Sequence, residues 1–367
     1  MEFEIEQARF LSALALAQTV ADKRSNNMPI LANVLMRASK DNKLVCSATD
    51  MMISITETIP VEVKTPGALT LGVRSLHNVV RTLPNKPLRI KSAENHWAEL
   101  SVARSSFKLM GQAHSDFPEL PDPKGQKFVG IPGHAFADLL QRTQFSVSTD
   151  EARVNLNGVL FECDGTTGTM VSTDGHRLTK YSLPLAGPKL DRGIIIPRKG
   201  MLEIKRVLDR LQGEVGLAVD SQHIFVQAQE LILSVKLNNV VFPPYEKVIP
   251  TEYKRRVTAL RDELMDALRR AEVMAPEKTA TVRVQIDKGS LQLTADNPDL
   301  GVAHQEIEID FQGEPLVAGF NARYLIEVLE AIDTKQVHLD FQGELDPCVL
   351  RPVGGADFLG VVMPMRI

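Results

Sequence analysis

The sequence predicts an α+β fold in which one unit, two helices packed on antiparallel sheets, occurs three times along 367 residues. Two proline-rich stretches that resemble each other, one beginning at Phe117 and the other at Phe242, divide the chain. A polar corner also recurs at nearly constant spacing, at Asp50, Asp174 and Asp296. Because these landmarks keep one order, we predict a triplicated unit. The predicted domains span residues 1–125, 126–254 and 255–367.

Two amphipathic helices are predicted in each unit, because apolar residues recur there at intervals of three and four. The stripes of the first helix are formed by Phe10, Leu11, Leu14 and Ala17, by Phe136, Leu139, Leu140 and Thr143, and by Leu264, Ala267, Leu268 and Ala271. Those of the second helix are formed by Leu76, Val79, Val80 and Leu83, by Met201, Ile204 and Leu208, and by Leu325, Val328, Leu329 and Ile332. Alternating residues such as 224–228 predict the strands. The proline-rich stretches are predicted to be extended linkers, since proline fixes φ.

The composition limits the classes of protein to consider. The net charge is −4, and no apolar run approaches the roughly 20 residues that span a bilayer. The acidic N-terminus lacks the pattern of a signal peptide. Three cysteines, Cys46, Cys163 and Cys348, lie far apart without a CxxC motif. They are therefore predicted to be small buried residues in a reducing cytosol, with neither disulfides nor a metal site.

The distribution of charge favours a ring. Six predicted helical windows, 6–24, 74–86, 134–144, 198–210, 261–272 and 323–333, hold 16 Lys and Arg against 12 Asp and Glu, so the rest of the chain carries the negative excess. A row of three similar domains leaves an unpaired sheet edge at each end, and two copies that join head to tail remove both edges. We therefore predict a head-to-tail dimeric ring whose helices line a central hole that attracts phosphate.

Seven basic residues in or beside these windows are the candidates for facing DNA. Arg74 and Arg198 occupy the same repeat position, at the start of the second helix, and Arg323 is its third copy. For any single one of them, a solvated helix face is the competing interpretation. The predicted DNA-facing residues are Lys23, Arg24, Arg74, Arg198, Lys199, Lys205 and Arg206.

An enzyme is the first alternative. Asp174 and His176 lie two residues apart, and an Asp–His pair can orient a general base. However, the sequence has no nucleophile elbow, P-loop, GxGxxG or HExxH pattern. The dipeptide Asp174-Gly175 is also typical of a turn, so no catalytic residues are predicted.

Four segments of the sequence resemble one family. They are residues 28–35 (MPILANVL), 173–178 (TDGHRL), 196–200 (IPRKG) and 361–367 (VVMPMRI). In these segments the chain resembles the bacterial DNA polymerase III beta subunit, the sliding clamp. The likeness runs from about Phe3 to Ile367 with the same tripartite layout, so it covers essentially the whole chain.

This resemblance implies a DNA polymerase processivity factor without enzymatic activity, cofactor or metal. The family forms a homodimeric ring of three clamp domains per chain that encircles double-stranded DNA. A clamp loader places the ring on DNA. Implied partners are the DNA polymerase III alpha subunit, other polymerases, and mismatch-repair and ligase-type proteins that carry clamp-binding peptides. The implied location is the cytoplasm, in association with the nucleoid.

The resemblance also implies residues for two sites. Partner peptides of the family bind in a cleft between the second and third domains. The matching positions are Arg153, Leu156, Thr173, Gly175, His176, Arg177, Leu178, Pro243, Lys247, Val248, Asn321, Tyr324, Val361, Met363, Pro364, Met365, Arg366 and Ile367. Lys247 stands where the family commonly has arginine, so no bidentate contact is expected from it. At the dimer interface, Phe107 and Leu109 are expected to meet Val273 and Met274.

The chemistry of the cleft residues agrees with peptide binding. Met363 and Met365 are flexible and polarizable, which suits a surface that accepts different peptides. Leu156, Leu178 and Val248 are expected to form an apolar floor. In the competing interpretation, the C-terminal tail only completes a strand of the last domain.

One departure from the family concerns the loop before Arg153. Well-known clamps offer polar and aromatic side chains to DNA there, whereas residues 148–151 are acidic in this chain. Arg24, Arg198 and Lys199 are therefore the better candidates for DNA contact. A second alternative follows, a clamp-like protein that has lost DNA encirclement and acts as a partner-binding scaffold.

Overall fold

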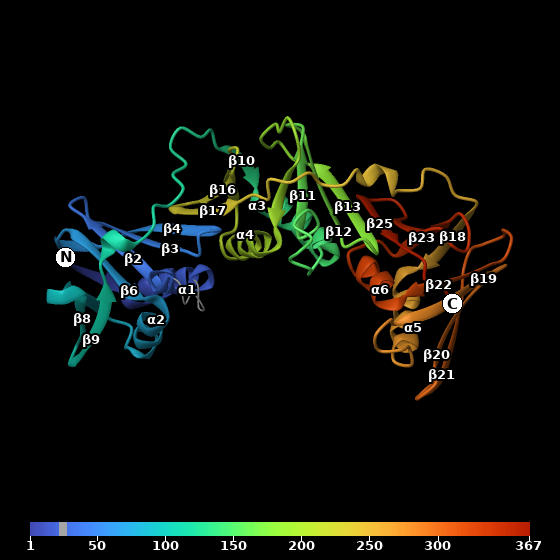
Figure 1. The fold of residues 1–367 in the computed structure, drawn as a ribbon, viewed down its shortest axis with the longest axis horizontal. Coiled ribbons are helices and arrows are strands. Elements are labelled where there is room, and N and C mark those ends of the chain that lie inside the picture. The colour runs from blue at the N-terminus through green and yellow to red at the C-terminus, as the bar shows by residue number, and fades with distance from the viewer. Residues whose placement is uncertain (22–27) are drawn as a thin grey trace. The chain divides into compact units, whose positions relative to one another are not determined.

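The computed structural model describes residues 1–21 and 28–367. These residues form two compact units. Figure 1 labels their helices and strands and colours the chain by residue number. Unit 1 comprises Met1–Gly133 and Leu202–Leu237, and unit 2 comprises His134–Met201 and Asn238–Ile367. The boundary divides the predicted second domain between the two units, so the three predicted domain limits stay a prediction.

Unit 1 is built on one antiparallel sheet, in the order β10-β15-β16-β17-β4-β3-β2-β6-β9-β8-β7-β1-β5. Two helices, α1 (Gln7–Val20) and α2 (Val73–Thr82), pack against each other, and α1 also contacts β3 and β4 (Figure 1). The strands are β1 (Glu2–Glu6), β2 (Asn33–Ser39), β3 (Lys43–Thr49), β4 (Ile53–Pro60), β5 (Glu62–Thr65), β6 (Gly67–Gly72), β7 (Pro87–Ser92), β8 (Trp97–Val102), β9 (Ser105–Gln112), β10 (Val129–Pro132), β15 (Glu214–Val219), β16 (His223–Ala228) and β17 (Leu231–Lys236).

Unit 2 contains two antiparallel sheets, in the orders β14-β11-β12-β13-β25-β24-β23-β18 and β21-β20-β19-β22. The helices α5 (Arg261–Glu272) and α6 (Ala322–Glu330) pack together, while α3 (Gly133–Thr143) and α4 (Arg198–Arg210) cross the unit boundary. The strands are β11 (Gly158–Cys163), β12 (Thr167–Thr173), β13 (Arg177–Pro184), β14 (Ile194–Pro197), β18 (Arg255–Leu260), β19 (Thr281–Asp287), β20 (Ser290–Asn297), β21 (Gly301–Glu308), β22 (Leu316–Asn321), β23 (Gln336–Phe341), β24 (Cys348–Pro352) and β25 (Asp357–Val362).

The predicted class, with two helices per repeat on antiparallel sheets, is confirmed. The predicted apolar stripes are buried in all six helices, with two partial exceptions. Leu11 and Val79 are only half-buried. In α2 the buried residues are Val73, Leu76 and Val80, so Val79 lies at the margin of the apolar face.

The first two predicted polar corners are tight turns between paired strands, whereas Asp296 lies within β20, opposite Val302 of β21, so the third predicted corner is not at a turn. Between β3 and β4 the Asp50 carboxylate accepts hydrogen bonds from the backbone N of Met52 and Ile53, at 2.9 and 2.7 Å. Between β12 and β13 the Asp174 carboxylate accepts from the backbone N of His176 and Arg177, at 2.9 and 3.0 Å. The residue after each aspartate has positive φ, which Gly175 adopts freely and which Met51 adopts at a steric cost.

The linkers and cysteines also agree with expectation in most respects. Phe117 has extended backbone angles and residues 118–123 form neither helix nor strand, but the second linker contains a short 3₁₀ helix, Tyr245–Lys247, which the proline pattern does not predict. Cys46, Cys163 and Cys348 are buried and free, and burial raises the pKa of the Cys46 and Cys348 thiols. Within the described residues, no helix is long and apolar enough to span a membrane.

Candidate functional site

The candidate site begins at the junction of β13 and β25 in unit 2. These strands pair antiparallel, with Leu178 opposite Val361 and Arg177 opposite Val362. Because side chains alternate across a sheet, Leu178 and Val361 point to one face and Arg177 to the other. Strand β13, which precedes α5 and α6 in the chain, is thus joined by backbone hydrogen bonds to β25, the strand that leads into the C-terminal tail.

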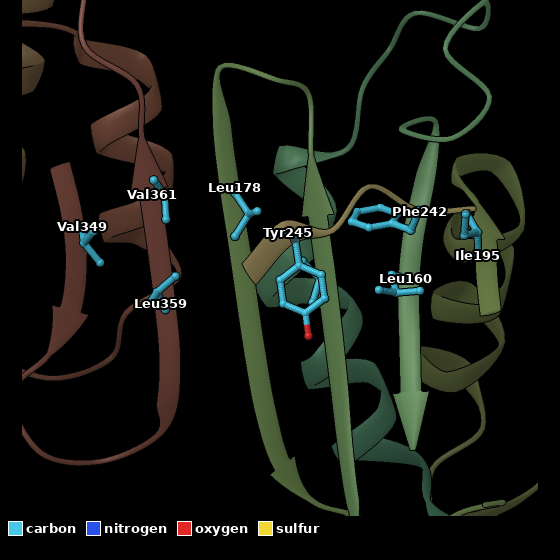
Figure 2. Close-up of a cluster of buried hydrophobic side chains, with 9 residues drawn as sticks. Leu160, Leu178, Ile195, Phe242, Tyr245, Val349, Leu359 and Val361 are labelled. Carbon is cyan, nitrogen blue, oxygen red and sulfur yellow. The ribbon is translucent and has the colours of Figure 1, made fainter. Parts of the chain in front are cut away.

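An apolar cluster forms on the Leu178 and Val361 face, and Figure 2 shows its side chains on β11, β13, β24, β25 and the linker. Phe242 and Tyr245 of the linker lie over it, with their ring centres 6.4 Å apart. The Tyr245 hydroxyl donates a 2.9 Å hydrogen bond to Glu162, and burial raises its pKa. The cluster consists of Leu160, Val171, Leu178, Ile195, Phe242, Tyr245, Val349, Leu359 and Val361, with Ile249 packed against it.

Several predicted cleft residues lie around this cluster with exposed or half-exposed side chains. Val248 is 45% exposed and Met363 is 36% exposed, so apolar surface is available beside the covered floor. Pro243 and Leu156 are half-buried, and Lys247 is exposed. A ligand would therefore meet these side chains rather than Leu178 and Val361, which are nearly fully buried.

The turn at residues 174–176 lies beside the first turn of α6. The imidazole of His176 stacks on the ring of Tyr324, with ring centres 6.4 Å apart and an interplanar angle of 21°. Asn321 caps α6, since its side-chain oxygen accepts from the backbone N of Arg323 and Tyr324. The backbone N of Met363 donates to the carbonyl of His176 at 2.9 Å, which continues the β13–β25 pairing by one bond.

Arg177 is buried, although the family resemblance implies that it contacts the peptide. Its guanidinium donates to Asp174 at 3.1 Å, to the carbonyl of Phe145 at 2.5 Å and to Glu327. The same group lies 4.4 Å from the centre of the Tyr324 ring. With its donors engaged inside the chain, Arg177 holds the walls of the site together.

A pocket of about 560 Å³ opens on this wall, large enough for several side chains of a ligand. Four predicted cleft residues line it, together with Arg198, which the sequence assigns to DNA. Arg153 reaches the pocket from the loop before β11, where it donates to the Asp174 carbonyl at 3.3 Å. The lining residues are Gln144, Phe145, Val147, Ser148, Thr149, Asp150, Arg153, Asp174, His176, Arg177, Arg198, Tyr324 and Glu327.

The C-terminal tail leaves β25 and lies along β22. The backbone N of Met365 donates to the Gly319 carbonyl at 2.8 Å, and Thr281 donates to the Met365 sulfur at 3.7 Å. A Cβ at Gly319 would overlap the Met365 carbonyl and the Ile367 side chain. Pro364 is half-buried, while Arg366 and Ile367 are exposed. The tail therefore makes a structural contact with β22 and still presents Met363 and Ile367 to solvent.

Family models describe all three thirds of the chain. The model of the DNA polymerase III beta subunit, N-terminal domain, matches residues 1–121. The central-domain model matches residues 130–244, and the C-terminal-domain model matches residues 246–366. The chain belongs to the beta sliding clamp family. Sliding clamps are DNA polymerase processivity factors rather than enzymes.

Relatives and solved structures match over the whole chain. The beta sliding clamp of Pseudomonas aeruginosa is 32% identical over 369 residues, and that of Escherichia coli is 29% identical over 368 residues; both are covered in full, as is this chain. The crystal structure of the C. crescentus beta sliding clamp has a TM-score of 0.95 at 30% identity, again with full coverage of both chains. The predicted family is confirmed.

The contacts of Asp174 and His176 bear on the alternative that the chain is an enzyme. The Asp174 carboxylate accepts from the backbone N of His176 and from the Arg177 guanidinium. The imidazole of His176 stacks on Tyr324 instead. Asp174 therefore shapes a turn and holds Arg177, which is a structural role.

The predicted DNA-facing residues differ in whether the structure describes them, in their exposure and in their ion pairs. Lys23 and Arg24 lie outside the described residues. Lys205 pairs with Asp209 at 2.7 Å and Arg206 donates to Glu203, so these two cations are partly neutralised along α4. Arg74, Arg198 and Lys199 are exposed. In α5 and α6 the arginines Arg261, Arg269 and Arg323 form ion pairs with Asp262, Glu330 and Glu272.

The predicted dimer residues lie at two surfaces. Phe107 and Leu109 are half-buried on β9, which pairs with β6 only at Gly111 and Gln112, so residues 105–110 have a single strand neighbour, β8. Val273 is 73% exposed and Met274 is half-buried, just after α5. In the second sheet of unit 2, β21 is one of the two terminal strands, and β22 is the other.

The three residues that hold Arg177 are absent from the predicted set. Phe145, Asp174 and Glu327 hold Arg177 from three directions. Glu327 follows Tyr324 by three residues on α6, so helical spacing alone places both on one face. No local pattern indicates the carbonyl of Phe145, because the contact joins segments that are distant in sequence.

Proposed function

We propose that this clamp closes with a second copy, head to tail, into a ring around double-stranded DNA and tethers polymerases through peptides bound in unit 2. The observation that carries the peptide site is the β13–β25 junction, which joins an apolar cluster, an exposed rim and the His176–Tyr324 wall. We also propose domain limits at residues 1–125, 126–254 and 255–367; the first limit lies between two family matches, whereas the last family match begins at residue 246, before the second limit.

The chemistry of the junction favours an extended, partly apolar peptide. Val248 and Met363 provide exposed apolar surface, and burial of apolar area is the main favourable term in binding. Arg153 and Arg198 border the adjoining pocket and would attract acidic or carbonyl groups of the peptide. The mixture suits a motif with leucine or phenylalanine anchors and a polar neighbour.

Two relatives support a ligand site in this fold. A Pseudomonas aeruginosa clamp, 32% identical with a TM-score of 0.93, has been crystallised bound to griselimycin. The C. crescentus clamp carries PEG at its proposed beta-motif tethering region. Griselimycin is therefore a ready probe for the proposed cleft of this chain.

The cleft is tested by placing a charge on its exposed rim. In Val248→Asp and Met363→Asp, binding of griselimycin and of a leucine- and phenylalanine-containing synthetic peptide should fall at least about tenfold, because an aspartate loses hydration on burial. Leu345→Asp, on a side chain that is 72% exposed between β23 and β24, is the matched control. Equal binding by all three variants would place the site elsewhere.

Unpaired strand edges in the two units support the proposed ring. Residues 105–110 of β9 and the outer side of β21 are unpaired edges in a single chain. Unpaired edges favour addition of another strand, and head-to-tail association of two copies would pair them. Retention on nicked circular DNA and release after linearisation would identify a closed ring. Equally fast release from both DNA forms would rule out encirclement.

The partners follow from this tethering role. We propose a clamp loader, the DNA polymerase III alpha subunit and other polymerases, and mismatch-repair and ligase-type proteins with clamp-binding peptides. A protein that encircles chromosomal DNA would reside with the nucleoid in the cytoplasm.

A scaffold without encirclement is the second candidate. It is favoured by the ion pairs of Arg261, Arg269 and Arg323, which leave the helices of the last predicted domain with little free positive charge. Such a scaffold would bind partner peptides and leave circular and linear DNA equally fast. The DNA-release experiment above separates it from a ring.

A further inference from the structure

The apolar face of the candidate site continues into a charged region of the same sheet. Leu178 lies opposite Val361, and Val361 lies opposite Val349. Figure 2 shows these three side chains on neighbouring strands. Val349 in turn lies opposite Asp340 on β23, and Asp340 lies opposite Arg256 on β18. Because directly opposite residues of antiparallel strands point to the same face, the five side chains form one row on this sheet.

A buried carboxylate holds two arginines at the charged end of this row. Asp340 is 3% exposed and accepts two hydrogen bonds from Arg256, at 2.6 Å from Nε and 2.8 Å from Nη2. The Nε atom of Arg351 lies 3.6 Å from Oδ2 of the same carboxylate. One negative charge therefore faces two positive charges, so the group carries an excess of one positive charge.

The donors of these two arginines are only partly used. Arg256 is bound through Nε and Nη2, and its guanidinium lies 4.1 Å from the centre of the Tyr253 ring. The side chain of Arg351 is 37% exposed, and within the described residues it donates no hydrogen bond. Since a guanidinium carries several N–H donors in a fork, both groups retain donors that fit a carboxylate.

A pocket of about 290 Å³ lies at this charged end and shares no lining residue with the pocket beside His176. Val349 lines it and also belongs to the apolar cluster, so the pocket adjoins the candidate peptide site. Glu252 is exposed on its rim, and in the part of the chain that the structure describes it forms no ion pair with either arginine. Burial and the Arg256 guanidinium lower the pKa of His338 on β23, so its imidazole adds no charge near neutral pH.

We propose that this pocket is a second contact point for the partner peptide, in which Arg351 and Arg256 bind an acidic side chain of that peptide. The proposal rests on the proposed function of the cleft in unit 2. Hydrogen bonds between a guanidinium and a carboxylate are charge-assisted and stronger than those between neutral groups. The continuous row favours a peptide over a free anion, because one extended chain covers both the apolar and the charged part of the sheet.

The geometry of the sheet sets the spacing of the two contact points along the peptide. Val349 on β24 and Arg256 on β18 are two strands apart, which corresponds to about 10 Å. An extended chain covers this distance in about three residues. The acidic residue is therefore expected about three positions from the nearest apolar anchor.

Matched peptides test the pocket without any change to the protein. Each synthetic peptide contains leucine and phenylalanine anchors and is amidated, so that no terminal carboxylate competes. Glutamate stands about three residues before or after the anchors, and glutamine replaces it in the matched peptide. In one of the two placements, calorimetric titration should show about fivefold tighter binding of the glutamate peptide, with a smaller ratio at high salt. Equal affinities in both placements would overturn the proposal.

The variant Arg351→Gln assigns that preference to the pocket. Its preference for glutamate over glutamine should fall below about twofold, while its affinity for griselimycin and for the glutamine peptide stays at the wild-type value. Arg37→Gln removes an exposed arginine from β2 of unit 1 and, as the matched control, should keep the full preference. A full preference in Arg351→Gln would overturn the proposal, because another group would then recognise the glutamate. A wild-type clamp that binds neither griselimycin nor any of the peptides would instead contradict the proposed function.

Discussion

The guanidinium of Arg177 lies 4.4 Å from the centre of the Tyr324 ring and so joins the turn after β12 to the first turn of α6. It also donates to Asp174 and to the Phe145 carbonyl at 3.1 and 2.5 Å. If Arg177 only contacts the peptide, as the family resemblance implies, its substitution should lower ligand affinity alone. If it holds the site together, as its contacts here indicate, its substitution should lower stability as well.

Arg177→Ala should lower both stability and ligand affinity. Removal of the guanidinium leaves Asp174 and Glu327 without their shared cation, so the free energy of unfolding should fall by about 2–3 kcal/mol. Griselimycin affinity should fall about tenfold, because Tyr324 and the turn lose their common support. Urea unfolding and calorimetric titration measure the two effects.

Arg153→Ala is the matched control for that prediction. Arg153 borders the same pocket, but its side chain is 53% exposed. Its loss should lower affinity and change the free energy of unfolding by less than about 0.5 kcal/mol. If Arg177→Ala behaves like Arg153→Ala, with stability unchanged, Arg177 has no holding role.

Deletion of residues 363–367 should abolish peptide binding and leave the dimer intact. The deletion removes the exposed Met363 and the Met365–Gly319 backbone bond, which together cost about 1 kcal/mol of folding free energy. Peptide titration and sedimentation measure the two properties. A deleted chain that no longer dimerises would assign the tail a mainly structural role.

Local patterns predict most of the helices and turns. The windows 198–210 and 261–272 coincide with α4 and α5, because period and burial agree there. The Asp174-Gly175 turn is also predictable, since a short acceptor followed by a glycine with positive φ closes a two-strand turn.

Long-range pairing is what the sequence leaves open. No pattern near Leu178 or Val361 gives their register, which depends on strands from different thirds of the chain. The partners of Arg177 follow only once that register is known. The contrast between the predicted DNA contact of Arg198 and its place in the pocket has the same origin, because that place depends on the packing of the loop before β11.

Charge reversal at Arg198 and Lys199 should weaken clamp loading or sliding, most at low salt. Two cations at the start of α4 become anions, and loading at about 50 mM salt should fall roughly tenfold, with a smaller loss at higher salt where exposed charges are screened. Retention on nicked circular DNA is the measurement. Lys124→Glu, on a side chain that is 91% exposed, is the control. Unchanged loading at low salt would remove Arg198 and Lys199 from the DNA-facing set.

The pH dependence of unfolding in acid should depend on the Arg142–Asp333 ion pair. The hydrogen bond from Arg142, at 2.9 Å, lowers the pKa of Asp333 below its usual range. A lowered carboxyl pKa gives stability that is fully present above the unfolded-state value, near about 4, and is lost as pH falls through the folded-state value. In Arg142→Gln, the pH dependence of unfolding below about pH 4 should become shallower, and the Asp333 carboxyl resonance should titrate at higher pH. An identical Asp333 titration in both proteins would contradict the pairing.

Leu109→Asp should convert the dimer to a monomer. Leu109 lies on the part of β9 that has one strand neighbour, and a buried aspartate at a subunit contact loses hydration without gaining a partner. Sedimentation at micromolar concentration should give twice the chain mass of 40.5 kDa for the wild type and the chain mass for the variant.

Val273→Asp, at the opposite predicted surface, should have the same effect, because a head-to-tail contact uses both surfaces once per interface. Leu345→Asp keeps a comparable new charge on an exposed turn and should remain dimeric. A wild-type chain that sediments as a monomer would contradict the ring, whereas a dimer that survives both β9 and α5 substitutions would move the interface elsewhere.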